Sequence, residues 1–249
     1  MAFLLREVEE GELPISFALP PHRTSSQSTF LVPFRRSYKR NFYKNVIYQL
    51  DVETGQPRSH AVPITFSANK WPTPSNSDKN FVFFDANGTA DGQHRGMKSN
   101  RIMALAITLI RPHRVYEVNL EDGRMKLVAS SSTELGFKDP IGLSAGPVRL
   151  ENGKLLIAGH IRRGAWEAPT RMTFFYECDA EAPFTIRRRT PVINFGWSRN
   201  VEYCNHIERE GDNLYVSLGV ADCGSVLLRL PLESITKLLK PVASFVKPR

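Results

Sequence analysis

The sequence has few cysteines, no long apolar run and almost no helical periodicity. Its three cysteines, Cys178, Cys204 and Cys223, include no Cys-x-x-Cys pair. They therefore give no disulfide framework and no zinc pattern, and they fit a reducing compartment, so we expect a cytoplasmic protein. The apolar start at residues 1–5 is followed at once by Arg6 and an acidic run, which is too short for a signal sequence or a membrane span.

Several short motifs of known chemistry are also missing. The chain has no G-x-G-x-x-G, no phosphate-binding P-loop and no G-x-S-x-G nucleophile motif. Its six histidines show no metal-ligand spacing beside an acid, so we predict no metal and no cofactor. No nucleic-acid-binding module is recognised, and we expect no nucleic-acid partner.

The sequence is rich in turn-forming, aromatic and basic residues. Its 249 residues include 17 Pro, 16 Gly, 15 Phe and 7 Tyr, a composition that favours β structure with many turns. The formal net charge is +8, which suggests an anionic partner such as a phosphate, a nucleotide or an acidic glycan. The alternative is that this charge serves only solubility.

Strand-like segments recur along the chain at intervals of about sixty residues. In one series an apolar run leads into an acidic residue or turn, and in a second series a glycine turn precedes an apolar run. The segments lie at 46–50, 115–120, 173–179 and 227–233, and at 152–159 and 210–219. Only residues 233–239 have helical spacing. This recurrence predicts an all-β protein of the β-propeller class, and the alternative is a β-sandwich. We expect a single propeller domain over 29–249, with residues 1–28 weakly structured or completing a blade.

In a propeller, equivalent loops of successive blades converge on one face, so polar residues after the inner runs should form one site. Pro112 stiffens a basic segment, and residues 160 and 162 share one strand face. Glu202, Cys204 and His206 alternate in the same way. An exposed basic turn or a structural histidine is the alternative in each case. The candidate ligand-binding residues are Lys79, Asn80, Arg111, His113, Arg114, His160, Arg162, Tyr203 and His206, and the candidate carboxylates are Asp78, Glu202 and Asp222.

Four segments together resemble the five-bladed propeller proteins related to glycoside hydrolase family 130. They are DKNFVFF (78–84), IRPHRVYEVNLEDG (110–123), GHIR (159–162) and YVSLGVADCGSVLLRLPLESI (215–235). They follow the order of that family's Glu-Lys-Asn, Pro-His, Gly-His and Tyr-Gly-x-x-Asp segments. The family's early Glu-Asp-Pro-Arg segment, which carries the catalytic acid, has no match here. The resemblance therefore implies five blades with a missing or rebuilt first blade.

The family includes phosphorylases and hydrolases of mannosides and related glycosyltransferases. The resemblance implies that Lys79, His113, Arg114 and His160 bind phosphate, that Asp222 binds a sugar hydroxyl and that Tyr176 lines the pocket. Our leading hypothesis is glycosyl transfer from a nucleotide sugar to a glycan acceptor, with Asp222, Glu202 or Asp78 as the catalytic carboxylate. The alternatives are a phosphorylase using inorganic phosphate or a hydrolase acting on mannosides, a non-catalytic glycan-binding propeller, and a basic scaffold for polyanions.

Overall fold

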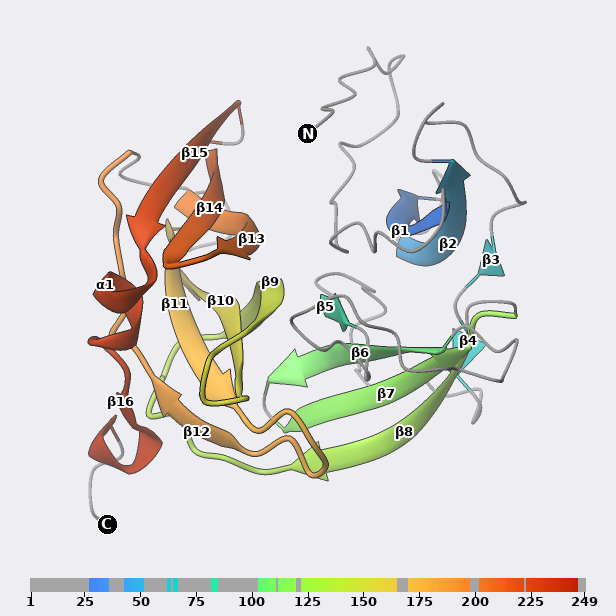
Figure 1. Ribbon diagram of the computed structural model, residues 1–249, viewed down its shortest axis with the longest axis horizontal. Coiled ribbons are helices and arrows are strands. Elements are labelled where there is room, and N and C mark those ends of the chain that lie inside the picture. The colour runs from blue at the N-terminus through green and yellow to red at the C-terminus, as the bar shows by residue number, and fades with distance from the viewer. Residues whose placement is uncertain are drawn as a thin grey trace. The chain divides into compact units, whose positions relative to one another are not determined.

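In the residues that it describes, the computed structural model is all-β apart from one short α-helix and one short 3-10 helix (Figure 1). In the part that it describes, no helix is long and apolar enough to cross a membrane. The described residues are 27–35, 43–51, 62–63, 65–66, 82–84, 103–110, 112–119, 122–164, 170–197, 202–221 and 223–245.

The described strands form four sheets. The first has the order β1 (Gln27–Arg35), β2 (Tyr43–Asp51), β3 (Val62–Pro63). The second has the order β4 (Thr65–Phe66), β8 (Arg124–Ser131), β7 (His113–Asn119), β6 (Met103–Ile110), β5 (Val82–Phe84). The third has the order β16 (Lys240–Pro241), β12 (Ile186–Arg189), β11 (Thr170–Cys178), β10 (Leu155–Arg163), β9 (Ile141–Arg149). The fourth has the order β13 (Glu202–Glu210), β14 (Asn213–Val220), β15 (Gly224–Pro231). Helix α1 is Leu232–Thr236, and the 3-10 helix η1 is Val242–Phe245.

The strands predicted from the repeats are present. Segments 46–50, 115–120 and 173–179 lie largely within β2, β7 and β11. Segments 210–219 and 227–233 lie largely within β14 and β15. The predicted helix at 233–239 is shorter, because α1 ends at Thr236. Within the last three sheets, consecutive long strands are neighbours, which is the order of propeller blades.

The chain divides into two compact units. One comprises Met1–Lys79, Asp85–Ala104 and Glu117–Lys126, and the other comprises Asn80–Phe84, Leu105–Tyr116 and Leu127–Arg249. The prediction of a single domain over 29–249 stays a prediction, and residues 1–26 lie outside the described residues. The candidate site below is built within the second unit.

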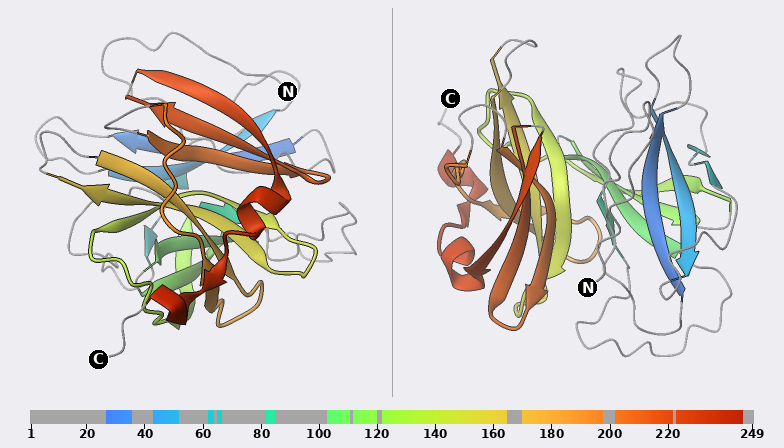
Figure 2. Two further views of the ribbon diagram at one scale, coloured as in Figure 1. Left: turned by 90° about the vertical axis from the view of Figure 1, so that its left-hand side faces the viewer. Right: turned by 90° about the horizontal axis from the view of Figure 1, so that it is seen from above.

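Strand β10 forms the centre of the second unit because both of its faces are buried. Leu155, Ile157 and Ile161 pack into one apolar cluster together with residues from β5 to β7, including Ile107. Leu156 and Ala158 point to the other face and pack with β13 and β14. Figure 2 shows β13–β15 beside β9–β11. This packing of sheet on sheet explains why the sequence of β10 is apolar at consecutive positions rather than at alternate ones.

Glycine is required at two kinds of position in this unit. Gly153 and Gly211 have φ angles of +77° and +56° in hairpin turns, a conformation that strains other residues. Gly159 is paired with Phe174 across β10 and β11, and a Cβ there would lie 2.5 Å from the Phe174 ring. Gly159 of the Gly-His motif therefore leaves room for the buried Phe174 ring, because it has no side chain.

Candidate functional site

Five predicted site residues lie outside the described residues, so their roles stay predictions. They are Asp78, Lys79, Asn80, Arg111 and Asp222. Segment 85–100, which falls between predicted strands, also lies outside them.

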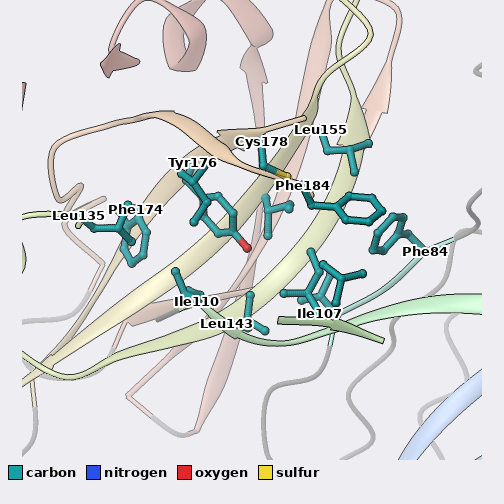
Figure 3. Packing of buried hydrophobic residues seen from close by; sticks show 14 of the residues in the cluster. Phe84, Ile107, Ile110, Leu135, Leu143, Leu155, Phe174, Tyr176, Cys178 and Phe184 are labelled. Atoms are coloured by element: carbon teal, nitrogen blue, oxygen red, sulfur yellow. The ribbon is translucent and has the colours of Figure 1, made fainter. Parts of the chain in front are cut away.

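His113 and Tyr176 form a buried pair in the core of the second unit. Both side chains are fully buried, with the rings edge to face at a centroid distance of 5.8 Å. Figure 3 shows Tyr176 among the apolar side chains of this core. The His113 Nδ1 atom is 2.8 Å from the Phe184 carbonyl oxygen, and Nε2 is 3.5 Å from the Tyr176 hydroxyl. Burial lowers the pKa of His113 to about 4, so the ring is neutral at pH 7. This arrangement suits a structural pair. Neither ring is accessible to a ligand, whereas the sequence had suggested that His113 binds phosphate and that Tyr176 lines the pocket.

The Arg114 side chain contacts the neighbouring tyrosine, Tyr116. Arg114 hydrogen bonds to Tyr116, although burial is the larger influence and raises the Tyr116 pKa. Arg114 and Tyr116 lie two residues apart on β7, so they share one face of that strand. The predicted phosphate contact of Arg114 is not tested by this placement.

Three basic side chains gather where β10 ends and β11 begins. Arg162 of β10 stands directly opposite Arg171 of β11, and His160 stands opposite Thr173. Residues that face each other across an antiparallel pair lie on the same side, with Cβ atoms about 5 Å apart. Like charges placed in this way repel, so an anion bound between the guanidinium groups would be stabilising. We call His160, Arg162 and Arg171 the basic cluster.

His160 is held by the neighbouring strand β9. Its Nδ1 atom is 2.9 Å from the Ser144 hydroxyl oxygen. Burial lowers its pKa to about 4, and the nearby charge of Arg171 acts in the same direction. The imidazole is therefore neutral at pH 7, and it is held in place by the Ser144 hydroxyl and by a hydrogen bond with the backbone of Leu143.

Tyr203 links the basic cluster to the next sheet. The Arg171 guanidinium lies 5.3 Å from the centroid of the Tyr203 ring, a cation–π contact that holds the arginine in place. The Tyr203 ring in turn lies against Gly219, where an added Cβ would come within 3.1 Å of it. The structure thus brings together His160, Arg162 and Tyr203 from the predicted set.

Glu202 is buried and hydrogen bonded through both of its carboxylate oxygens. Oε1 accepts from the Phe195 N–H at 2.5 Å, and Oε2 accepts from the Trp197 N–H at 2.8 Å. Its exposed fraction is 1%. A carboxylate occupied in this way anchors the preceding loop. The geometry favours that role over the catalytic one suggested by the sequence.

His206 does not share a strand face with Glu202 and Cys204, and that prediction is wrong. The register between β13 and β14 shifts between Cys204 and His206, which inserts one extra residue as a β-bulge. After the bulge Ile207 points inward, and His206 is only partly buried. The His206 Nε2 atom lies 4.0 Å from Glu208 Oε2. Burial lowers the pKa of His206, and the charge of Glu208 opposes this shift.

Sequence reasoning missed Arg171, Ser144 and Trp197. Arg171 belongs to the site only because the β10–β11 register places it opposite Arg162. Ser144 is identified by its contact with His160, which depends on the β9 register. The sequence carried no signal for these pairings, although Arg171 lies two residues before the predicted strand segment 173–179. Among the described residues no group of three or more potential metal ligands occurs.

The fold resembles those of carbohydrate-active enzymes. A β-1,2-mannobiose phosphorylase from Listeria innocua, solved with β-1,2-mannobiose, matches with a TM-score of 0.54 and 15% identity over 84% of this chain and 57% of that one. A glycosyl hydrolase from Bacteroides ovatus matches with a TM-score of 0.54 and 12% identity over 92% of this chain and 66% of that one. No protein-family model matches the chain, and no curated protein matches its sequence.

These likenesses concern the fold. Together with the sheet order they confirm the predicted all-β propeller class, whereas the count of five blades stays a prediction. The chain spans less than two thirds of the length of either neighbour. At such low identity, similarity of fold alone does not transfer an activity.

Proposed function

We propose that this chain is a carbohydrate-active protein that cleaves a glycosidic bond, as a phosphorylase or hydrolase of mannosides. The observation that carries the proposal is the basic cluster beside Tyr203, at the ends of β10, β11 and β13. The fold likeness to a mannobiose phosphorylase supports the same assignment. Neither of these neighbours is named as a nucleotide-sugar glycosyltransferase, so they favour our alternative hypothesis over our leading one.

In this proposal the basic cluster binds inorganic phosphate. Two guanidinium groups on directly opposed strand positions can share the oxygens of one anion, and the neutral His160 lies beside them on the same strand face. Tyr203 keeps Arg171 oriented when the site is empty. The arrangement thus offers the phosphate several donors that are fixed before binding.

The reaction would be phosphorolysis. A phosphate oxygen attacks the anomeric carbon, the bond from that carbon to the glycosidic oxygen breaks, and a carboxylic acid donates a proton to the departing oxygen. The products are a glycosyl phosphate and a shortened saccharide. Water replaces phosphate in the hydrolase variant. We propose Asp222 as the acid, because its loop joins β14, whose residue Val220 pairs with Glu202, to β15.

A second candidate function is glycan binding without catalysis. Two described carboxylates near these strand ends already have partners: Glu202 binds backbone amides, and Asp139 lies 2.7 Å from Arg163. A propeller that had lost its acid would retain the basic cluster and the fold. Whether Asp222 or Asp78 acts as the acid distinguishes the enzyme from the binding module.

The test is incubation with β-1,2-mannobiose in the presence and absence of phosphate. Phosphorolysis predicts phosphate-dependent release of mannose and mannose 1-phosphate, and hydrolysis predicts mannose alone. Asp222→Asn and Asp78→Asn should be compared with Asp122→Asn, whose carboxylate lies in an exposed turn and pairs with Arg124. Full turnover in both Asp222→Asn and Asp78→Asn would contradict their assignment, and saccharide binding without turnover in the wild type would favour the binding module.

A further inference from the structure

Trp197 is a large aromatic residue that the fold holds in an exposed position. Its exposed fraction is 55%, the highest among the large apolar side chains that the structure describes as exposed. Leu127, Val128 and Leu227, which are also exposed, lie on the strands β8 and β15. Trp197 instead lies in the connection between β12 and β13, five residues before Glu202, the first residue of β13.

The backbone around Trp197 is fixed by side-chain acceptors. The N–H groups of residues 195 and 197 donate to the two oxygens of Glu202, and the Gly196 N–H donates to Asn194 Oδ1 at 2.8 Å. Three consecutive amides are therefore bound by side chains, and Gly196 adopts a φ of +85° between them. Phe195 packs against the apolar cluster of β13 and β14. The loop thus has a partly buried residue at 195 and an exposed one at 197.

Both ends of this loop are attached to strands that carry the basic cluster and its neighbours. At its start the Ile193 N–H donates to the Thr173 carbonyl oxygen at 2.7 Å, and Thr173 is paired with His160. At its end Glu202 precedes Tyr203, which contacts Arg171. The exposed indole is therefore anchored between β11 and β13, at the end of both strands where the basic cluster lies.

Sugar recognition combines two kinds of contact. A pyranose ring has a rim of hydroxyl groups and a face of C–H groups, so it needs hydrogen-bonding side chains together with a flat apolar surface. The basic cluster and Tyr203 can supply the first, and an exposed indole supplies the second. An indole on a rigid loop is also ordered before binding, which lowers the entropic cost of association.

We propose that Trp197 is a saccharide-binding residue whose indole stacks on one face of a pyranose ring of the bound glycan. This inference rests on the proposed function, because it assigns a sugar ring to the same site. It adds a specificity determinant that hydrogen bonding alone would not give. Glu202 is then the positioning residue that holds the stacking surface.

The experiment measures β-1,2-mannobiose and mannose binding by calorimetry, with Trp197→Ala and Trp197→Phe compared with the wild type. Loss of the indole should weaken binding about tenfold or more, and phenylalanine should restore much of it. The control is Leu227→Ala, which removes another exposed apolar side chain and should leave binding unchanged. Melting temperatures of all variants should match, since neither side chain is buried.

Tryptophan emission gives an independent readout. The chain has three tryptophans, and saccharide should change the emission of the wild type but not that of Trp197→Phe. Unchanged affinity in Trp197→Ala, or no binding of either saccharide to the wild type, would overturn the inference. Turnover is measured separately, so saccharide binding that depends on Trp197 without any turnover would refute the proposed enzyme while the stacking role stands.

Discussion

At the end of the third sheet where β10 begins, Lys154, Arg187 and Arg188 bind carboxylates. Lys154 and Arg187 lie 2.8 Å and 2.6 Å from Asp179, and Arg188 makes two hydrogen bonds with Glu177. At the end where β10 finishes, Arg162 and Arg171 face each other across the strand pair, and Arg171 lies over a tyrosine ring. The same sheet thus holds its cations in two different ways.

In our proposal the difference separates charges that stabilise the fold from charges that bind a ligand. Glu177 is 1% exposed, and an ionised carboxylate at such a position requires a partner such as Arg188. The pKa of Asp179 is lowered chiefly by its hydrogen bond with Arg187, which again marks a stabilised pair. Arg162 and Arg171 instead stand on directly opposed strand positions, where like charges repel, and in our proposal this arrangement is shaped for a ligand.

The largest expected effect is at Arg171. Arg171→Met should reduce phosphorolytic kcat/KM by roughly 100-fold or more, because it removes a fixed cation from the phosphate site. The loss should fall mainly on the KM for phosphate, and Arg171→Lys should restore part of it. Steady-state kinetics at varied phosphate concentration measure both.

The matched control for Arg171 is Arg187→Met at the opposite end of the sheet. Arg187 is an exposed arginine that is paired with Asp179. The Arg187→Met variant should leave the KM for phosphate unchanged. Equal losses in both variants would show that the two ends do not differ as proposed.

Glu177→Gln should give the largest loss of stability. It leaves Arg188 without its buried charged partner and weakens the contact with Asn152 Nδ2 at 3.2 Å. Because Arg188 is 36% exposed and can be partly hydrated, we expect a decrease of about 2–3 kcal/mol in the free energy of unfolding. Urea denaturation measures it. A loss of phosphate affinity with normal stability would contradict the structural role of this end.

Glu202→Gln tests whether the carboxylate anchors or catalyses. A glutamine retains one carbonyl oxygen, so one of the two loop amides loses its acceptor, and stability should fall by about 1–2 kcal/mol. Turnover should fall no more than in Trp197→Ala. A loss of turnover of roughly 1,000-fold at unchanged stability would instead identify Glu202 as catalytic.

The fold was more predictable than the site. Period-two patterns and turn signals identified most long strands, because alternation and glycine turns are local properties of the chain. Gly153 and Gly211 marked real hairpin turns. Local patterns could not predict which side chains come together in one site, because that depends on the register between strands.

His206 and Arg171 show the two failures of register from sequence. A single extra residue at the bulge in β13 removed His206 from the face it was expected to share with Glu202. Arg171 joined the basic cluster through a strand pairing that no local pattern indicates. His113 shows a third limit, because a motif histidine beside basic residues turned out to be buried against Phe184 and Tyr176. Burial depends on the tertiary structure, so the local motif could not predict it.

His113 and His160, whose pKa values are lowered to about 4, predict a loss of stability in acid. In the unfolded chain His113 binds a proton as the pH falls below about 6.5, whereas in the folded protein it does so only near pH 4. Acidification through this window therefore favours the unfolded state, by about 1.4 kcal/mol per pH unit for a fully buried histidine. His113→Gln should reduce this slope, as measured by urea denaturation between pH 6.5 and 4.5.

The same titration distinguishes His160 from His113. Burial also lowers the pKa of His160, but this histidine belongs to the basic cluster. A bound phosphate should raise the pKa of His160, because a nearby anion favours the protonated ring, and should leave that of His113 unchanged. NMR titration of the ring protons with and without phosphate tests this. Equal shifts in both histidines would contradict a phosphate site at the basic cluster.

The smallest expected effect is at Lys154, whose pair with Asp179 is partly exposed. Lys154→Met should lower the free energy of unfolding by about 0.5 kcal/mol, because Asp179 retains Arg187. The lowered pKa of Asp179 means that this contribution is present above the ordinary carboxyl range and is lost as the pH falls through the folded value. Salt should reduce it, whereas salt should not abolish the effect of Glu177→Gln, since the carboxylate of Glu177 is buried. Denaturation at low and high ionic strength compares the two variants, and an equal salt dependence would show that burial does not separate these pairs.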